Sequence, residues 1–457
     1  MKSVLYRGTL LAHLALMSLH PILAERLSAA LTAAAPLGLT PRDARLPVLP
    51  GKAHAVIGMR RAGKTTFLRQ LLAERRADLP LERAIYLSFD DDRLAGIGGE
   101  QLGFLLEEYY RRHPSLRGHV VVYWFLDEIQ FVPGWERFVR RVLDTEKIEV
   151  VVSGSSARLL SREVHTSLRG RGLATVIRPF SFREFLRHRR EEPSQEPRRW
   201  TAAQRSLVEK RFGEFLVTGG FPEAQGLDPA LRVELLQGYV DTVLFRDVVE
   251  RYGVTQVAAL RWVVRHCLRN PARSFSVHRL HQDLKTQGHG VAKDAVHALL
   301  GHLLDAFLLT AVALATESER QRNSNPRKLY PADPGLIRAF DASGRCQVGH
   351  ALETAVANEL ARRGAEIGYV KTRAGGEVDF LVRRPDAGPE LIQVCADPAD
   401  AETQDRELRA LADAAVEHPR ATRRLLVLNS DAVVSVKAPD IQVQPAYEWL
   451  LETPAPE

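Results

Sequence analysis

Nearly continuous apolar runs, each followed by small or acidic residues, mark the first part of the chain. Residues 84–89, 119–126 and 148–152 are of this kind, which is typical of parallel strands covered on both faces. Residues 55–57 end an earlier apolar run, and residues 66–72 have the amphipathic pattern of a helix. Strands that alternate with helices predict an α/β fold with an open parallel sheet.

The turn between residues 57 and 66 fits the phosphate-loop pattern G-x-x-x-x-G-K-[ST]. Gly58 and Gly63 let the backbone turn so that its N–H groups face phosphate oxygens. We expect the Lys64 ammonium to reach the β- and γ-phosphates and the Thr65 hydroxyl to bind Mg2+. The residues predicted to hold ATP are Gly58, Arg60, Arg61, Ala62, Gly63, Lys64, Thr65 and Thr66.

Two acidic residues follow the strand predicted at 119–126, where an open α/β sheet places them beside the phosphate loop. We expect Asp127 to hold Mg2+ through water and Glu128 to activate the attacking water as general base. Ser153, at the tip of the next strand, is the candidate for sensing the γ-phosphate or orienting water. A solvated turn is the alternative interpretation of that serine.

A basic loop at residues 168–172 precedes a fifth predicted strand at 173–177. Arginines that stabilise the γ-phosphate in the transition state are often supplied by a neighbouring subunit. Arg169 and Arg171 are therefore candidates for this role in a homo-oligomer, with Arg158 as a third. A basic surface loop is the alternative.

These motifs resemble a known family when they are taken in order. The stretches that carry the resemblance are residues 58–66, 125–130, 134–136, 153–156, 168–171 and 179–185. The succession is similar to the prokaryotic AAA-type P-loop ATPases that carry a C-terminal domain of unknown function, over about residues 50–430. The resemblance implies a core sheet of five parallel strands, Mg-ATP as ligand, and Asp127 with Glu128 as the Walker-B pair.

Two helices at residues 277–284 and 292–304, separated by a polar turn, precede strands at 307–312 and 328–330. This is the winged-helix order, which favours double-stranded DNA as a partner. The basic residues that would neutralise phosphates are Lys293, Arg320, Arg322, Arg327 and Lys328. The second helix exposes an aspartate and two histidines beside a single lysine, so a packing role is the other interpretation.

The last part of the chain resembles the PD-(D/E)xK nuclease core, in which two acids bind Mg2+ and a lysine steadies the attacking hydroxide. Glu353 and Asp379 match the first two positions. Gln393 and Cys395 stand where the second acid and the lysine should be, and neither has the required charge. We therefore expect a nuclease-like fold that has lost cleavage, or a plain α/β interaction module. Lys371, on the adjacent strand, is the candidate substitute for the lysine, although nothing in the sequence places it at the site.

Composition and termini add little to this picture. Apolar content of 45%, charged content of 26% and a net charge of +7 are compatible with nucleic acid as partner without requiring it. The odd number of cysteines, widely spaced, suits a cytoplasmic location. Residues 10–17 are apolar but are followed by His20 and Pro21, so an amphipathic helix and an export signal remain open. We expect no membrane helix.

The sequence thus predicts an Mg2+-dependent ATPase that passes its nucleotide state to a winged-helix and nuclease-like region. The expected domains are an N-terminal helical segment (1–45), a P-loop ATPase domain (46–190), a helical linker with a winged helix (191–340) and a restriction-endonuclease-like α/β domain (341–457). A nucleotide-switched binding protein and a DNA-processing nuclease are the alternative functions.

Overall fold

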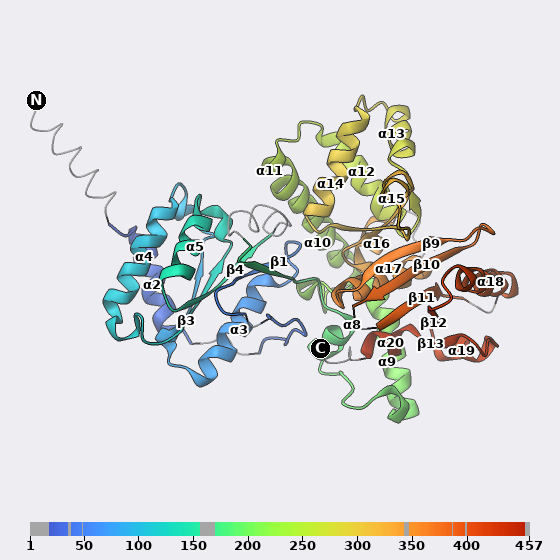
Figure 1. Ribbon diagram of the computed structural model, residues 1–457, viewed down its shortest axis with the longest axis horizontal. Helices are drawn as coiled ribbons and strands as arrows, with labels where there is room; N and C mark the ends of the chain where they lie inside the picture. The colour runs from blue at the N-terminus through green and yellow to red at the C-terminus, as the bar shows by residue number, and fades with distance from the viewer. Residues whose placement is uncertain are drawn as a thin grey trace, which may run out of the picture. The chain divides into compact units, whose positions relative to one another are not determined.

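The computed structural model describes residues 18–34, 38–47, 49–155, 170–341, 347–385, 387–397 and 400–452 (Figure 1). The chain divides into two compact units. The first comprises Met1–Gly58 with Gly63–Ile177, and the second Met59–Ala62 with Arg178–Glu457. The predicted N-terminal helix at 10–17 lies outside the described residues. None of the described helices is long and apolar enough to cross a membrane.

The first unit contains the predicted five-stranded parallel sheet, in the order β2-β3-β4-β1-β5. Its strands are β1 (Ala53–Ile57), β2 (Ala84–Ser88), β3 (Val122–Asp127), β4 (Ile148–Gly154) and β5 (Gly172–Val176). Every residue of β1 is buried, as the continuous apolar runs require of strands covered on both faces. The prediction of five parallel core strands is confirmed.

Helices cover both faces of this sheet because successive strand residues point to opposite sides. Phe125 packs with Phe67 and Leu68 of α3 (Lys64–Asp78). The adjacent Trp124 points the other way and contacts Tyr109 edge to face, at a ring distance of 5.4 Å. Tyr109 belongs to α4 (Gly99–Arg112), which packs against α2 (Pro21–Thr32) and α5 (Trp135–Thr145).

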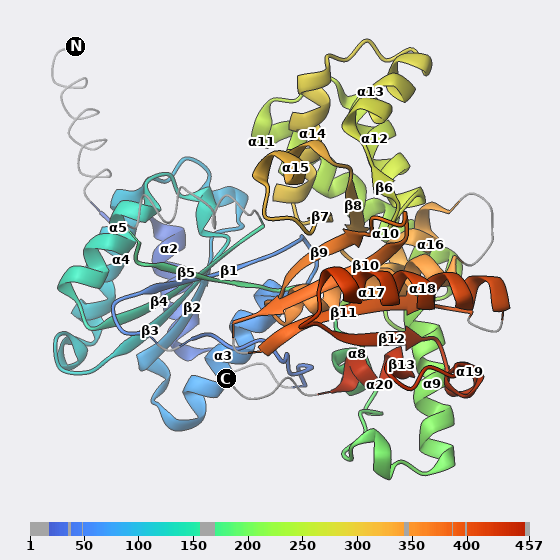
Figure 2. The same cartoon turned by 45° about the vertical axis from the view of Figure 1, so that its right-hand side comes forward.

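The second unit begins with helices and continues into a mixed region. Its first helices are α8 (Phe182–His188), α9 (Ala202–Thr218), α10 (Pro229–Thr242), a π-helix (Val243–Val249), α11 (Glu250–Tyr252) and α12 (Val257–Arg269). Then come β6 (Ser274–Phe275), α13 (Val277–Thr286), α14 (Lys293–Asp305), β7 (Leu309–Leu314), α15 (Glu319–Ser324), β8 (Arg327–Pro331) and α16 (Pro334–Phe340). Figure 2 shows α12, α13 and α14 grouped near β6, β7 and β8. Helix, turn, helix and two antiparallel strands therefore occur in the predicted order.

The last stretch of the second unit is α/β. Its elements are α17 (Val348–Arg362), β9 (Glu366–Lys371), β10 (Glu377–Arg384), β11 (Ala387–Cys395), α18 (Ala401–Glu417), β12 (Thr422–Val427), α19 (Ser430–Ser435), β13 (Gln442–Pro445) and α20 (Ala446–Leu451). One eight-stranded sheet runs in the order β13-β12-β11-β10-β9-β7-β8-β6. The strands predicted for the wing, β7 and β8, thus belong to the same sheet as the nuclease-like strands. The four predicted domain ranges stay a prediction.

A buried carboxylate joins two segments of the second unit. Asp333 caps α16, and its two oxygens accept hydrogen bonds from the N–H groups of Gly335 (2.9 Å) and Gly220 (2.6 Å). Burial raises the pKa of Asp333 to about 7, against the effect of the two N–H donors, which lower it. Gly219, at the end of α9, lies so close that a Cβ there would be 1.7 Å from Asp333 Oδ1.

We expect Gly219→Ala to destabilise the second unit. Its backbone, with φ 73° and ψ −173°, lies in a region that costs a residue with a side chain about 1–3 kcal/mol, and the contact with Asp333 adds to that. Thermal unfolding measures the loss. Gly213→Ala is the matched control, because Gly213 lies in α9 with open space around its Cβ position and should gain up to about 1 kcal/mol. Equal stability of the two variants would contradict this account.

Candidate functional site

The predicted phosphate loop connects β1 to α3 in a conformation that needs its glycines. Gly58 and Gly63 have φ of 142° and 99°. A Cβ on Gly58 would lie 2.0 Å from the carbonyl oxygen of Ile177, whose N–H donates to Ile57 of β1. Lys64 is buried at the start of α3, and its Nζ donates to the carbonyl of Gly58 at 3.0 Å. The ammonium is thus folded over the loop whose main-chain N–H groups would bind phosphate.

The side chain of Asp127, 2% exposed at the end of β3, collects several hydroxyl donors. Its Oδ2 accepts from the hydroxyls of Thr65 (2.8 Å) and Tyr86 (2.6 Å), and its Oδ1 accepts from Ser153. Burial and the Asp127 carboxylate both raise the pKa of Tyr86, so that its phenol stays a donor. The structure therefore brings together the two residues predicted to hold Mg2+. Their hydroxyl and carboxylate oxygens are ligands of the kind that Mg2+ prefers.

Glu128 has a left-handed backbone, with φ 53° and ψ 40°, which is uncommon for a residue with a side chain. Its N–H donates to the hydroxyl of Ser153 at 3.0 Å, and its carboxylate accepts from the amide of Gln130. Ser153 therefore contacts both predicted acidic residues, Asp127 through its side chain and Glu128 through its backbone. A strained backbone held by such contacts is a common feature of functional sites.

Arg171, one of the predicted arginines, is not brought to the phosphate loop of its own chain. Arg171 forms an exposed ion pair with Asp144. Its carbonyl accepts from the N–H of Ala53, the first residue of β1, whereas the phosphate loop follows the last residue of that strand. Arg171 thus lies at the opposite end of β1 from the loop of its own chain. Arg169 and Arg158 lie outside the described residues, so an arginine supplied by a second subunit stays a prediction.

The remaining predicted loop residues have mixed surroundings. Met59–Ala62 group with the second unit, in which Arg60 Nε donates to the buried carboxylate of Asp247 at 2.7 Å. Arg61 and Thr66 are exposed. A nucleotide contact by the Arg60 side chain would require this ion pair to open, whereas its main-chain N–H needs no such change.

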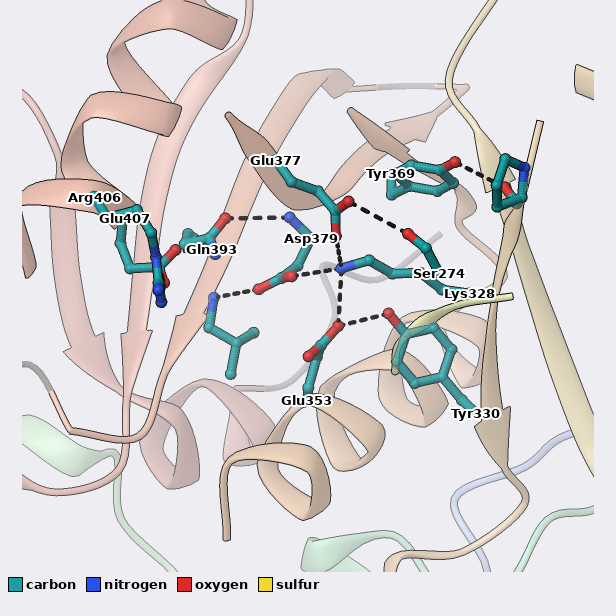
Figure 3. Close-up of polar contacts among 12 residues, drawn as sticks. Ser274, Lys328, Tyr330, Glu353, Tyr369, Glu377, Asp379, Gln393, Arg406 and Glu407 are labelled. Atoms are coloured by element: carbon teal, nitrogen blue, oxygen red, sulfur yellow. Dashed lines mark hydrogen bonds and ion pairs between the residues drawn. The ribbon is translucent and has the colours of Figure 1, made fainter. Parts of the chain in front are cut away.

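A second polar cluster lies in the eight-stranded sheet (Figure 3). Lys328 of β8 is 2% exposed, and its Nζ lies 2.8 Å from Asp379 Oδ1, 2.8 Å from Glu377 Oε1 and 3.3 Å from Glu353 Oε1. The Tyr330 hydroxyl also donates to Glu353, at 2.7 Å. The interpretation of Lys328 as a DNA phosphate contact is therefore wrong, because its side chain is buried among carboxylates.

Glu353 and Asp379, the two acids of the resemblance to nucleases, both contact Lys328 Nζ and so lie close together. A register shift in β10, between Val378 and Leu381, brackets Asp379, and such bulges re-aim side chains. Gln393 accepts from the Asp379 N–H at 3.2 Å and donates to Glu407. Lys371, the substitute considered from sequence, is exposed at the end of β9.

The comparisons with known proteins follow the same division of the chain. Residues 50–186 match a family described as an AAA domain, and residues 209–345 match a domain of unknown function. The uncharacterized protein MJ1544 of Methanocaldococcus jannaschii is 32% identical over 422 residues, which cover 90% of this chain and 90% of the relative. This chain belongs to the MJ1544 family. A family member in Haemophilus influenzae, also uncharacterized, is 28% identical over 72% of this chain and 79% of its own length.

Similarity to solved structures is weaker. The Aeropyrum pernix Orc1 protein in complex with DNA is 20% identical, with a TM-score of 0.27 over 70% of this chain and 90% of that chain. Pyrobaculum aerophilum Cdc6p is 13% identical, with a TM-score of 0.24 over 64% and 87% of the respective chains. Scores this low carry no argument about ligands or partners.

These findings confirm an AAA-type P-loop ATPase domain in this member of the MJ1544 family. The winged-helix and nuclease-like interpretations stay predictions, as do the individual roles of the site residues. Sequence reasoning missed Tyr86 and Gln130 in the first unit, and the cluster position of Lys328 with Tyr330 in the second. No local sequence pattern identifies the partners that these side chains contact in the structure.

Proposed function

We propose that the first unit binds ATP with Mg2+ and hydrolyses the bond to the γ-phosphate. The observation that carries this proposal is the 2.8 Å hydrogen bond from the Thr65 hydroxyl to the Asp127 carboxylate. Thr65 directly follows Lys64 in the phosphate loop. The hydrogen bond brings together a hydroxyl and a carboxylate of the kind used for Mg2+ in P-loop ATPases. When bound, Mg2+ would supply positive charge to the β- and γ-phosphate oxygens.

The residues of this chain would share the remaining work. Main-chain N–H groups of the loop and the start of α3 bind the phosphates. The Lys64 ammonium exchanges the Gly58 carbonyl for phosphate oxygens. Glu128 accepts the proton of the attacking water. Ser153 fixes the positions of Asp127 and Glu128 through its hydrogen bonds to the Asp127 side chain and the Glu128 backbone. An arginine from a second copy, Arg169 or Arg171, would complete a homo-oligomeric site.

We further propose double-stranded DNA as the partner of residues 257–331. Three of the predicted basic residues, Lys293, Arg320 and Arg327, are exposed and available to phosphates. Arg322 lies 3.5 Å from both Glu319 and Glu366. These carboxylates offset its positive charge and weaken its attraction for a DNA phosphate.

Phosphate release from ATP tests the ATPase, with Mg2+ or EDTA and with double-stranded DNA, single-stranded DNA or RNA added. We expect turnover that requires Mg2+ and rises with double-stranded DNA. Joint replacement of Arg320 and Arg327 by alanine should lower the salt slope of DNA binding by about 2, one for each phosphate contact. Lys437→Ala, an exposed lysine outside this region, is the control.

The outcomes separate the two parts of the proposal. Tight ATP binding without turnover would make the protein a nucleotide-switched binding protein. A basal ATPase unaffected by any nucleic acid, with no DNA binding, would remove the DNA partner and leave the ATPase intact.

A further inference from the structure

The acidic cluster of the second unit already contains a cation, which is the ammonium of Lys328. We propose that this ammonium is the resident cation of the cluster and takes the place of a divalent metal, so that the site is closed to Mg2+ by the chain's own lysine. This inference concerns a different unit from the ATP site and does not depend on the proposed function.

Three acidic side chains surround the Lys328 ammonium. Its Nζ donates hydrogen bonds to Asp379 Oδ1 at 2.8 Å and Glu353 Oε1 at 3.3 Å, and it forms an ion pair with Glu377 Oε1 at 2.8 Å. These oxygens come from α17, which carries Glu353, and from β10, which carries Glu377 and Asp379. The lysine itself comes from β8, so that the contact joins strands on either side of β7 and β9 in the sheet order. Figure 3 shows Nζ between the three carboxylates.

Further donors of the chain occupy oxygens of the same acids. Glu353 Oε1 also accepts from the Tyr330 hydroxyl, and Asp379 Oδ2 accepts from the N–H of Val394 at 3.0 Å. The amide of Gln393 is used by the Asp379 N–H and by Glu407. No group of three or more histidine, cysteine, aspartate or glutamate residues in the described part of the chain has the arrangement of a metal site.

Charge balance supports the same assignment. Burial lowers the pKa of Lys328, but the negative charges of Asp379, Glu353 and Glu377 raise it by more than burial lowers it. The net shift is upward, so the ammonium stays charged. Burial and the Asp379 charge raise the pKa of Glu353 above its usual range. The ammonium thus offsets negative charge of the cluster without a divalent ion.

The residue aligned with the nuclease lysine does not restore a metal site. Burial and the nearby Glu407 raise the pKa of the Cys395 thiol to about 11, so that it is neutral near pH 7. A neutral thiol is a poor ligand for a hard cation, and Gln393 brings no charge to neutralise one. With the Lys328 ammonium in place, the residues present therefore do not fit the Mg2+ that the nuclease-like resemblance implies.

Lys328→Met tests the proposal, because methionine preserves the length of the unbranched apolar stem of lysine and removes the ammonium charge. Mn2+ binding is followed by electron paramagnetic resonance in the nucleotide-free full-length protein. We expect one additional Mn2+ per chain in the variant, with a Kd of about 10⁻³ M or tighter, the range of weak oxygen-ligand sites. Mn2+ should also raise the Tm of the variant and not that of the wild type. Lys371→Met, at the exposed lysine on β9, should behave as the wild type.

A comparison of wild type with Asp379→Asn decides the matter even where Lys328→Met does not fold. Identical Mn2+ isotherms for these two proteins support an ammonium-filled cluster. One fewer Mn2+ site in Asp379→Asn than in the wild type would overturn the proposal, as would Mg2+-dependent plasmid cleavage by the wild type that Asp379→Asn abolishes. A folded Lys328→Met protein that gains no Mn2+ site would also overturn it.

Discussion

Glu128→Gln is expected to lower the ATP turnover rate by about 10²–10⁴-fold, the usual contribution of a general base. The glutamine amide cannot accept the proton of the attacking water. The substitution preserves the size of the side chain and its reach toward Gln130. It leaves Asp127, Thr65 and the phosphate loop unchanged. ATP affinity should therefore stay close to that of the wild type. Phosphate release under saturating Mg-ATP and equilibrium binding of ATP measure the two effects separately.

Glu74→Gln is the matched control, since Glu74 is an exposed acid on α3 of the same unit and accepts a hydrogen bond from Gln70 in the preceding turn. It should leave turnover and affinity unchanged. Wild-type turnover in Glu128→Gln would assign the base to another group. Loss of ATP binding in that variant would show that Glu128 contributes to binding of ATP before hydrolysis, which would contradict its assignment as a general base alone.

Lys64→Ala is expected to weaken ATP binding by roughly 30- to 4,000-fold, which corresponds to the about 2–5 kcal/mol lost when one partner of a buried charge pair is truncated. The lysine is buried over the loop, and its ammonium is the positive charge that the phosphate-loop pattern assigns to the β- and γ-phosphates. Titration with a fluorescent ATP analogue measures the change, and thermal unfolding without nucleotide shows whether the fold is retained.

Lys147→Ala removes an exposed lysine from the same unit and should bind ATP as the wild type does. Tight ATP binding by a folded Lys64→Ala protein would remove the loop from the proposed function. Because Glu128→Gln is expected to keep ATP and Lys64→Ala to lose it, the pair distinguishes binding from chemistry.

The predictions that succeeded from sequence depended on local patterns. The strand at β3 is recognisable because a strand buried on both faces must be apolar along its whole length. The phosphate loop is recognisable because positive φ at positions 58 and 63 requires glycine, and because the lysine and threonine follow at a fixed spacing. Asp127 could be placed beside Thr65 of the loop because parallel strands end at the same edge of the sheet.

Other features of the site could not be found in this way. Tyr86 and Asp127 are 41 residues apart, and their hydrogen bond exists because β2 pairs with β3. Lys328 and Asp379 are 51 residues apart. Lys328 was interpreted as a DNA phosphate contact because it is one of the basic residues of the predicted wing, whereas the order β9-β7-β8 and the position of α17 enclose it.

The amino-acid sequence by itself therefore determined the strands of the first unit and the position and conformation of its phosphate loop, because backbone conformation and burial follow from short-range residue patterns. Only the tertiary structure decided which carboxylates face Lys328 and which hydroxyls face Asp127. The physical reason is that a charge or a hydroxyl finds its partner through strand pairing and helix packing, and these depend on residues far along the chain.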